Sequence, residues 1–237
     1  MRLYLSPSNQ PHNKYIYMDL TEKQNCEKIA ILLSDKLKKD YDIEIELATF
    51  DLAIGDKGRS LEAYNKRCDF YLAIHTNAAG GINISATGAV GIYNSNQNKG
   101  KQLMTAMVGE LTKINPIKSN RVTPIYHQNS LIEINSPMNF NIESSLIEID
   151  FHDNIKTVPF LINQHEQITD AMIKSIINTF IINRKQETKQ PIYRVRTTWD
   201  NANSQLGAFT ELENAKKSII KTTKYKIYNE KGVEIYP

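Results

Sequence analysis

The run DFYLAIHT, residues 69–76, sets the strongest limit on the fold, because it is apolar at nearly every position before His75. A strand with one face in water alternates apolar and polar residues, whereas a continuous apolar run is typical of a strand covered on both faces. The run SLIEIDF, residues 145–151, has a similar character. Strands of this kind predict a sheet with helices on both sides.

The segments around these runs alternate between strand and helix patterns. In residues 22–39, apolar residues recur at helical spacing, and Thr21 with Gln24 forms a capping-box pattern. The same reasoning predicts further helices at 59–68, 99–114 and 168–182, and further strands at 2–5, 43–49 and 88–94. We therefore predict an α/β fold with a mixed, mostly parallel sheet flanked by helices.

The chain divides at NRKQETKQP, residues 183–191, a charged stretch that ends in proline and predicts a linker. The main domain is then 1–182, and residues 192–237 form a small α+β module. Within the module we expect a strand, a helix and two further strands, at 193–199, 210–222, 223–229 and 233–236.

Composition restricts the function only weakly. The 237 residues are 41% hydrophobic and 23% charged, which is ordinary for a globular protein. The net charge of +3 lies in residues 190–237, where eight basic side chains face five acidic ones. Such an excess favours an anionic polymer, either cell wall or nucleic acid, and is too small to choose between them.

The cysteines and the first residues indicate where the chain is made. Cys26 lies in a helical pattern and Cys68 lies just before an apolar strand, so we expect buried free thiols rather than a disulfide. Met1 and Arg2 lead directly into a strand, so we expect no signal peptide. No apolar stretch approaches the length needed to span a bilayer, so we expect no membrane span. We therefore expect the protein to be made in the cytoplasm. If it acts outside the cell, another agent must export or release it.

Polar residues gather where predicted strands end or a helix begins. His12 lies in the opening loop LSPSNQPHN, Glu22 begins a helix, His75 ends a strand, and Glu148 interrupts another. Taken singly, each has an ordinary structural explanation, such as the preference of glutamate for a helix N-terminus. Together, two imidazoles and a carboxylate match a zinc site with one open position, and a further glutamate matches a general base.

Four stretches carry a family resemblance: TEKQNCEKIAILLSDKL, DFYLAIHTNAAGG, ATGAVGIYN and SSLIEIDFHDN. Their order and spacing over about 1–182 resemble the zinc-dependent N-acetylmuramoyl-L-alanine amidases of the amidase type 3 family, which includes endolysin-like and autolysin-like enzymes. The tail YRVRTTWDNANSQLGAFTELENAKKS resembles the small sporulation-related repeat modules that bind peptidoglycan.

The resemblance implies hydrolysis of the amide between N-acetylmuramic acid and L-alanine, with zinc as cofactor and peptidoglycan as partner. It implies a lytic enzyme with neither nucleic acid nor membrane as partner, and the expected lack of a signal peptide implies action on the wall after release. Glu148 matches the catalytic glutamate, and Glu22 and His75 match two zinc ligands. The flanking Ile147 and Ile149 are expected to desolvate Glu148 and raise its pKa.

The opening loop departs from the family pattern, because Asn9 stands where the first histidine ligand is expected. A carboxamide oxygen is a poor zinc ligand beside imidazole. We therefore predict His12 as the third ligand, with Asn9 or His152 as alternatives. By strand alternation Asp150 and His152 share a side with Glu148, where they would instead orient it or a ligand.

Two other functions remain open at this point. A wall-binding protein with a degenerate metal site would account for Asn9. A zinc peptidase that cuts the stem peptide would use the same groups, and only its products would differ.

Overall fold

The computed structural model describes residues 1–80, 85–186, 190–220 and 224–236. These form two compact units, Met1–Lys185 and Gln186–Pro237. The division between the units falls inside the predicted linker, of which residues 187–189 lie outside the described residues.

The first unit is built on a six-stranded sheet in the order β2-β1-β3-β6-β4-β5. The strands are β1 (Arg2–Pro7), β2 (Glu44–Leu47), β3 (Phe70–Asn77), β4 (Val90–Tyr93), β5 (Ile125–His127) and β6 (Glu143–Phe151). Strands β2, β1, β3 and β6 are parallel, whereas β4 runs antiparallel to β6 and carries β5 parallel to itself. The predicted mixed, mostly parallel sheet is confirmed.

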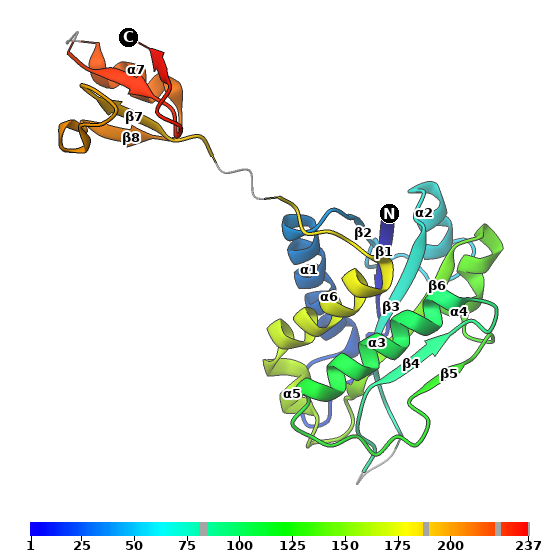
Figure 1. Ribbon diagram of the computed structural model, residues 1–237. Coiled ribbons are helices and arrows are strands. Elements are labelled where there is room, and N and C mark those ends of the chain that lie inside the picture. Colours follow the sequence, from blue (N-terminus) through cyan, green and yellow to red (C-terminus); the bar gives the residue numbers. More distant parts are fainter. Residues whose placement is uncertain (81–84, 187–189, 221–223, 237) are drawn as a thin grey trace. The chain divides into compact units, whose positions relative to one another are not determined.

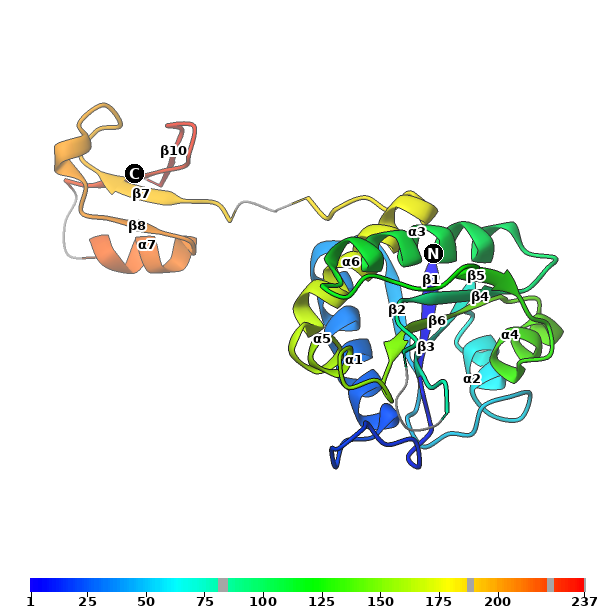
Figure 2. The same cartoon turned by 90° about the horizontal axis from the view of Figure 1, so that it is seen from below.

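Helices cover both faces of this sheet (Figures 1 and 2). One face carries α1 (Glu22–Asp40), α3 (Asn98–Ile114), α5 (Val158–Asn163) and α6 (His165–Phe180). The other carries α2 (Arg59–Asn65), α4 (Ile132–Asn135) and the 3-10 helix η1 (Ser136–Phe140). Each face has its own apolar cluster, so the central strands β3 and β6 are buried on both sides, as their continuous apolar runs predict.

Local signals account for the first long helix. The Thr21 side chain accepts a hydrogen bond from the Gln24 backbone, and the Gln24 side chain caps the Thr21 backbone in return. The predicted capping box is therefore confirmed, and it makes Glu22 the first residue of α1. A glycine allows β4 and α3 to pack closely. A Cβ added to Gly91 of β4 would lie 2.6 Å from Met104 Cβ of α3, so a larger residue at this position would push the two elements apart.

Hydrophobic periodicity in the sequence did not predict the short elements of the first unit. Helix α2 ends at Asn65 rather than 68, and β5, α4, η1 and α5 were not predicted. The four unpredicted elements are only three to six residues long. Such lengths are too short for a hydrophobic period of 3.6 residues (helix) or 2 residues (strand) to be recognised.

The second unit is a four-stranded antiparallel sheet with one covering helix. Its order is β10-β9-β7-β8, with β7 (Tyr193–Arg196), η2 (Ala202–Ser204), β8 (Gly207–Phe209), α7 (Leu212–Ile219), β9 (Lys226–Tyr228) and β10 (Glu234–Tyr236). Strand β8 was not predicted, because its three residues carry no alternation. Residues 221–223, which the sequence assigns to the end of a helix and the start of a strand, lie outside the described residues.

Two further expectations concern cysteines and membrane spans. Cys26 and Cys68 are both free and buried, as expected. Within the described residues, the helices are too short or too polar to cross a bilayer.

Candidate metal centre

Glu22 lies at the N-terminus of α1 and is almost completely buried. Its Oε2 atom accepts a hydrogen bond from Asn13 Nδ2 at 2.7 Å, and its backbone N–H donates to Asn13 O at 2.7 Å. Its Oε1 atom lies 2.8 Å from His75 Nδ1 and accepts a longer bond from Thr76 N at 3.3 Å. The opening loop and β3 therefore both orient this carboxylate.

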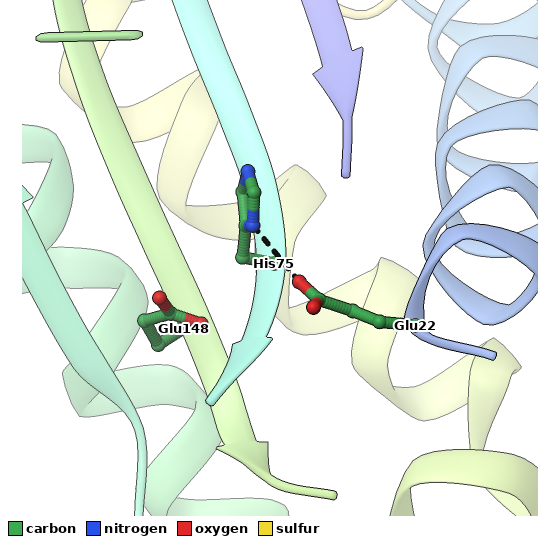
Figure 3. A group of neighbouring side chains, drawn as sticks. All are labelled: Glu22, His75 and Glu148. Carbon is green, nitrogen blue, oxygen red and sulfur yellow. Dashed lines mark hydrogen bonds and ion pairs between the residues drawn. The ribbon is translucent and has the colours of Figure 1, made fainter. Parts of the chain in front are cut away.

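His75 lies near the carboxyl end of β3 with both ring nitrogens engaged. Nδ1 faces Glu22, and Nε2 lies 2.7 Å from Oε2 of Glu133, which reaches the ring from α4. The side chain is buried at 6% exposure, so water does not compete for either contact. Figure 3 shows the ring on β3 with Glu22 on the side of α1.

Glu148 completes the group from the neighbouring strand β6, where it is the register partner of His75. Ligand atoms of Glu22, His75 and Glu148 all lie within 4.8 Å of one another (Figure 3). Glu148 Oε2 is buried, and no hydrogen-bond partner for it lies among the described residues. A buried carboxylate oxygen without a partner is costly unless a ligand satisfies it.

Burial and mutual charge set the protonation of these groups. Burial raises the pKa of Glu148 to about 7; His75 opposes that shift, while the carboxylates of Glu22 and Glu133 add to it. Burial by itself would lower the pKa of His75, but Glu133 and Glu22 outweigh it and hold that pKa well above its usual value. Burial likewise opposes ionisation of Glu22, yet its contacts with His75 and Asn13 lower its pKa.

The desolvation of Glu148 has a different origin from the one expected. Ile147 and Ile149 belong to the apolar cluster beneath α1, α3 and α6, whereas the adjacent position Leu146 belongs to the cluster on the opposite face. Side chains alternate along a strand, so Glu148 lies on the face of Leu146, away from both isoleucines. Tertiary packing on that face, rather than the flanking residues, raises its pKa.

These residues fit a divalent cation. Imidazole nitrogen and carboxylate oxygen are both accepted zinc ligands, and the partnerless Oε2 of Glu148 supplies a free donor at the convergence point. The structure therefore has a possible metal site formed by Glu22, His75 and Glu148.

His12 lies apart from this group. It is exposed, and the cluster found among the described residues does not include it. The loop instead brings the next side chain, Asn13, to Glu22. Asn9 Nδ2 donates to Leu52 O at 3.3 Å, so the loop uses this side chain to hold the segment after β2. No contact among the described residues supports the ligand role that the sequence predicts for His12.

His152 and Asp150 have structural partners instead of Glu148. The buried His152 ring stacks on Tyr15 at 5.3 Å between centroids, and its Nδ1 donates to Thr76 O at 2.8 Å. Asp150 Oδ1 accepts hydrogen bonds from Gly88 N at 2.9 Å and Phe151 N at 2.8 Å. These contacts hold the ends of β3 and β6 together, and among the described residues no hydrogen bond joins either side chain to Glu22, His75 or Glu148.

Glu133 is a site residue that the sequence reasoning missed. Its carboxylate is 4% exposed and accepts hydrogen bonds from Ser6, Tyr71 and His75. A signal was present: the tetrapeptide LIEI occurs at 131–134 and again at 146–149, and each copy sets one glutamate among aliphatic residues. A glutamate so enclosed by apolar neighbours is a candidate for burial in either copy.

Comparison with known families supports an amidase relationship. The family model described as N-acetylmuramoyl-L-alanine amidase matches residues 12–178. No curated protein sequence matches the chain.

Solved structures share the fold of the first unit. An N-acetylmuramoyl-L-alanine amidase from Clostridium difficile 630 is 22% identical, with a TM-score of 0.62, over 76% of this chain and 96% of that chain. The catalytic domain of the amidase CwlV from Bacillus (Paenibacillus) polymyxa var. colistinus is 15% identical, with a TM-score of 0.65, over 77% and 99%. An amidase of Nostoc punctiforme is 16% identical, with a TM-score of 0.64, over 76% and 97%. At these identities the likeness establishes the fold.

Proposed function

Because this chain belongs to the N-acetylmuramoyl-L-alanine amidase family, we propose that it is a zinc-dependent enzyme that hydrolyses the amide between N-acetylmuramic acid and L-alanine in peptidoglycan. The convergence of Glu22, His75 and Glu148 within 4.8 Å, beside a partnerless carboxylate oxygen, is the observation that carries the proposal. An amide hydrolase needs electrophilic activation and a base, and this group contains residues suited to both.

Glu22 and His75 are the residues that we assign to metal binding. When bound, zinc would supply Lewis-acid polarisation of the scissile carbonyl and acidification of a water molecule. Both side chains are held from outside the site, Glu22 by Asn13 and His75 by Glu133. Their donor atoms are therefore oriented before any ligand arrives.

Glu148 is the residue that we assign as general base. Its free Oε2 would accept a proton from the attacking water, and the same proton would pass to the L-alanine nitrogen as the carbon–nitrogen bond breaks. A base works best with a pKa near the working pH, and the pKa of Glu148 is raised to about 7. Proton uptake and delivery by one carboxyl group leave it unchanged at the end of the cycle.

For the second unit we propose peptidoglycan binding through the open face of its sheet. Val195 packs beneath α7, so alternation turns Arg194 and Arg196 to the other face. There the Arg196 guanidinium lies 5.0 Å from the ring centroid of Trp199, and both arginines contact Gln205. An aromatic ring with amide and guanidinium donors suits a sugar chain bearing carboxylates. The cellular setting we propose is lytic, with action on the wall after release from the cytoplasm.

Digestion of purified peptidoglycan by the full chain tests the enzymatic proposal. We expect new L-alanine amino termini that disappear with a chelator and return with zinc. New amino termini on other stem residues would identify a peptidase instead. An absence of products with wall binding retained would favour a binding protein with a degenerate site, which is the reading that Asn9 supports.

The binding surface has a separate test with matched charge. The double substitution Arg194→Ala and Arg196→Ala should weaken sedimentation with peptidoglycan at least several-fold. The pair Lys217→Ala and Lys231→Ala removes the same charge from exposed positions elsewhere in the unit and should leave binding unchanged. Equal losses in both pairs would show that only the net charge matters.

A further inference from the structure

Glu133 contacts the candidate metal centre from the face of the sheet opposite to α1. Its Oε2 lies 2.7 Å from His75 Nε2, and its Oε1 accepts hydrogen bonds from Ser6 Oγ at 2.6 Å and Tyr71 OH at 2.9 Å. Helix α4, which carries it, is separated from His75 by 58 positions in sequence. The contact is therefore a product of tertiary structure and not of local chain geometry.

The burial of this carboxylate needs an explanation. A carboxylate that is 4% exposed loses most of its hydration, which costs several kcal/mol unless donors replace the water. Three donors do so, and one of them, Ser6, is itself held by the buried guanidinium of Arg59 through Nη1 at 2.9 Å. The surrounding residues thus hold Oε2 firmly at the outer nitrogen of the His75 ring.

Both ring nitrogens of His75 face a carboxylate, which can only accept: Nε2 faces Glu133 and Nδ1 faces Glu22. The two carboxylates differ in place, because Glu22 belongs to the metal-binding cluster found among the described residues and Glu133 does not. A cation in this cluster would take Nδ1 and Glu22 as ligands, so the one proton left on the ring would be held at Nε2 by Glu133. Metal-binding histidines commonly donate their other N–H to a carboxylate, which fixes the tautomer and increases the donor strength of the ligating nitrogen.

We propose that Glu133 is a positioning residue of the metal centre: it holds His75 in the Nε2–H tautomer and directs Nδ1 at the cation. This inference rests on the proposed function, because it presumes that His75 binds the metal. It adds to that function a carboxylate–imidazole–cation chain of Glu133, His75 and the ion. Glu133 makes no contact with the reacting atoms in this assignment and acts through His75.

Zinc affinity of the full chain is the first test, measured by competition with a chromophoric chelator. Glu133→Gln should bind zinc about 10–100-fold more weakly, because the neutral amide is a poorer acceptor and its NH₂ group can select the opposite tautomer. Glu143→Gln, at the far end of β6, is the matched control and should bind as the parent does. Tyr71→Phe removes another donor to Glu133 but keeps the His75 contact, and should cost less than Glu133→Gln.

A second test uses the parent protein, so its result does not depend on whether a variant folds. Nitrogen-15 NMR of histidine-labelled parent protein, loaded with zinc, should show His75 Nε2 protonated and Nδ1 as the metal-bound nitrogen. The reverse assignment would overturn the proposal even if Glu133→Gln were unfolded.

Zinc binding by the variants distinguishes an error in the metal centre from an error in the role of Glu133. If neither the parent protein nor His75→Ala binds zinc, the metal centre itself is wrong, and this proposal falls with it. If the parent binds zinc, His75→Ala does not, and folded Glu133→Gln binds as the parent does, the metal centre stands and the role of Glu133 is refuted. A selective loss in Glu133→Gln, with Nε2 protonated in the parent, supports both.

Discussion

His75 and Glu148 are register partners on the neighbouring parallel strands β3 and β6. The hydrogen-bonded ladder fixes the spacing of their backbones, so the proposed ligand and the proposed base stand side by side on the two central strands of the sheet. The carboxyl end of β3 also meets the N-terminus of α1, which brings Glu22 to the same place. Groups held on strands and helices are placed more accurately than groups on loops.

Replacement of the proposed base should separate chemistry from metal binding. Glu148→Gln should lower the rate of amide hydrolysis by about 10²–10⁴-fold while zinc affinity stays within a few-fold of the parent, because Glu22 and His75 remain. Peptidoglycan digestion and chelator competition measure the two effects, with Glu143→Gln as control. Full activity would refute the base assignment, and a large loss of zinc affinity would make Glu148 a metal ligand instead.

The raised pKa of Glu148 predicts a pH-dependent stability cost in the metal-free protein. The native carboxyl, with a pKa of about 7 against a model value of 4.5, keeps its proton after the unfolded chain has lost it. The contribution of this carboxyl to the free energy of unfolding is therefore fully present at low pH and is lost as the pH rises from about 4.5 through 7. Because the residue is partly exposed, we expect about 1–2 kcal/mol rather than the full effect of the shift.

Glu148→Gln removes this cost. Urea unfolding in a chelator should show the variant more stable than the parent at pH 8, with an advantage that shrinks by about 1–2 kcal/mol at pH 4.5. An advantage that does not change with pH would show that the carboxyl titrates normally in the native state.

The third metal ligand can be tested at His12. Because this side chain is exposed and outside the cluster that the described residues form, we expect His12→Ala to leave zinc affinity unchanged. His75→Ala should lower it by at least 100-fold in the same competition assay. A comparable loss in His12→Ala would support the ligand role predicted from the sequence, and would require the opening loop to close on the ion.

The buried Arg59 should matter for stability more than for chemistry. Its guanidinium donates to Ser6 Oγ at 2.9 Å, to Phe50 O at 2.7 Å and to Pro7 O. Arg59→Met leaves these acceptors and the nearby Glu133 without their cation, at a cost of about 3–5 kcal/mol. Urea unfolding measures this, with exposed Arg184→Met as the control that should change stability by less than about 0.5 kcal/mol. A similarly small change for Arg59→Met would mean that water replaces the guanidinium.

Patterns within one element predicted much of the architecture. The capping box at Thr21, the apolar run at 69–76 and the helical spacing of 99–114 were enough to place α1, β3 and α3. The same patterns placed Glu22 and His75 at element ends, where the structure brings them together. The loop between β1 and α1 was less predictable, because its path depends on contacts such as Asn13 with Glu22 and Asn9 with Leu52 O.

The two copies of LIEI show where prediction from sequence ends. Residues 146–149 lie in strand β6, whereas 132–134 of the other copy lie in helix α4, and both glutamates face His75 or its neighbours. Sequence determined that each copy carries a carboxylate among aliphatic side chains. Only tertiary structure decided the conformation and the partner of each, because Glu133 meets His75 across 58 positions, and contacts that distant are set by the packing of the whole sheet.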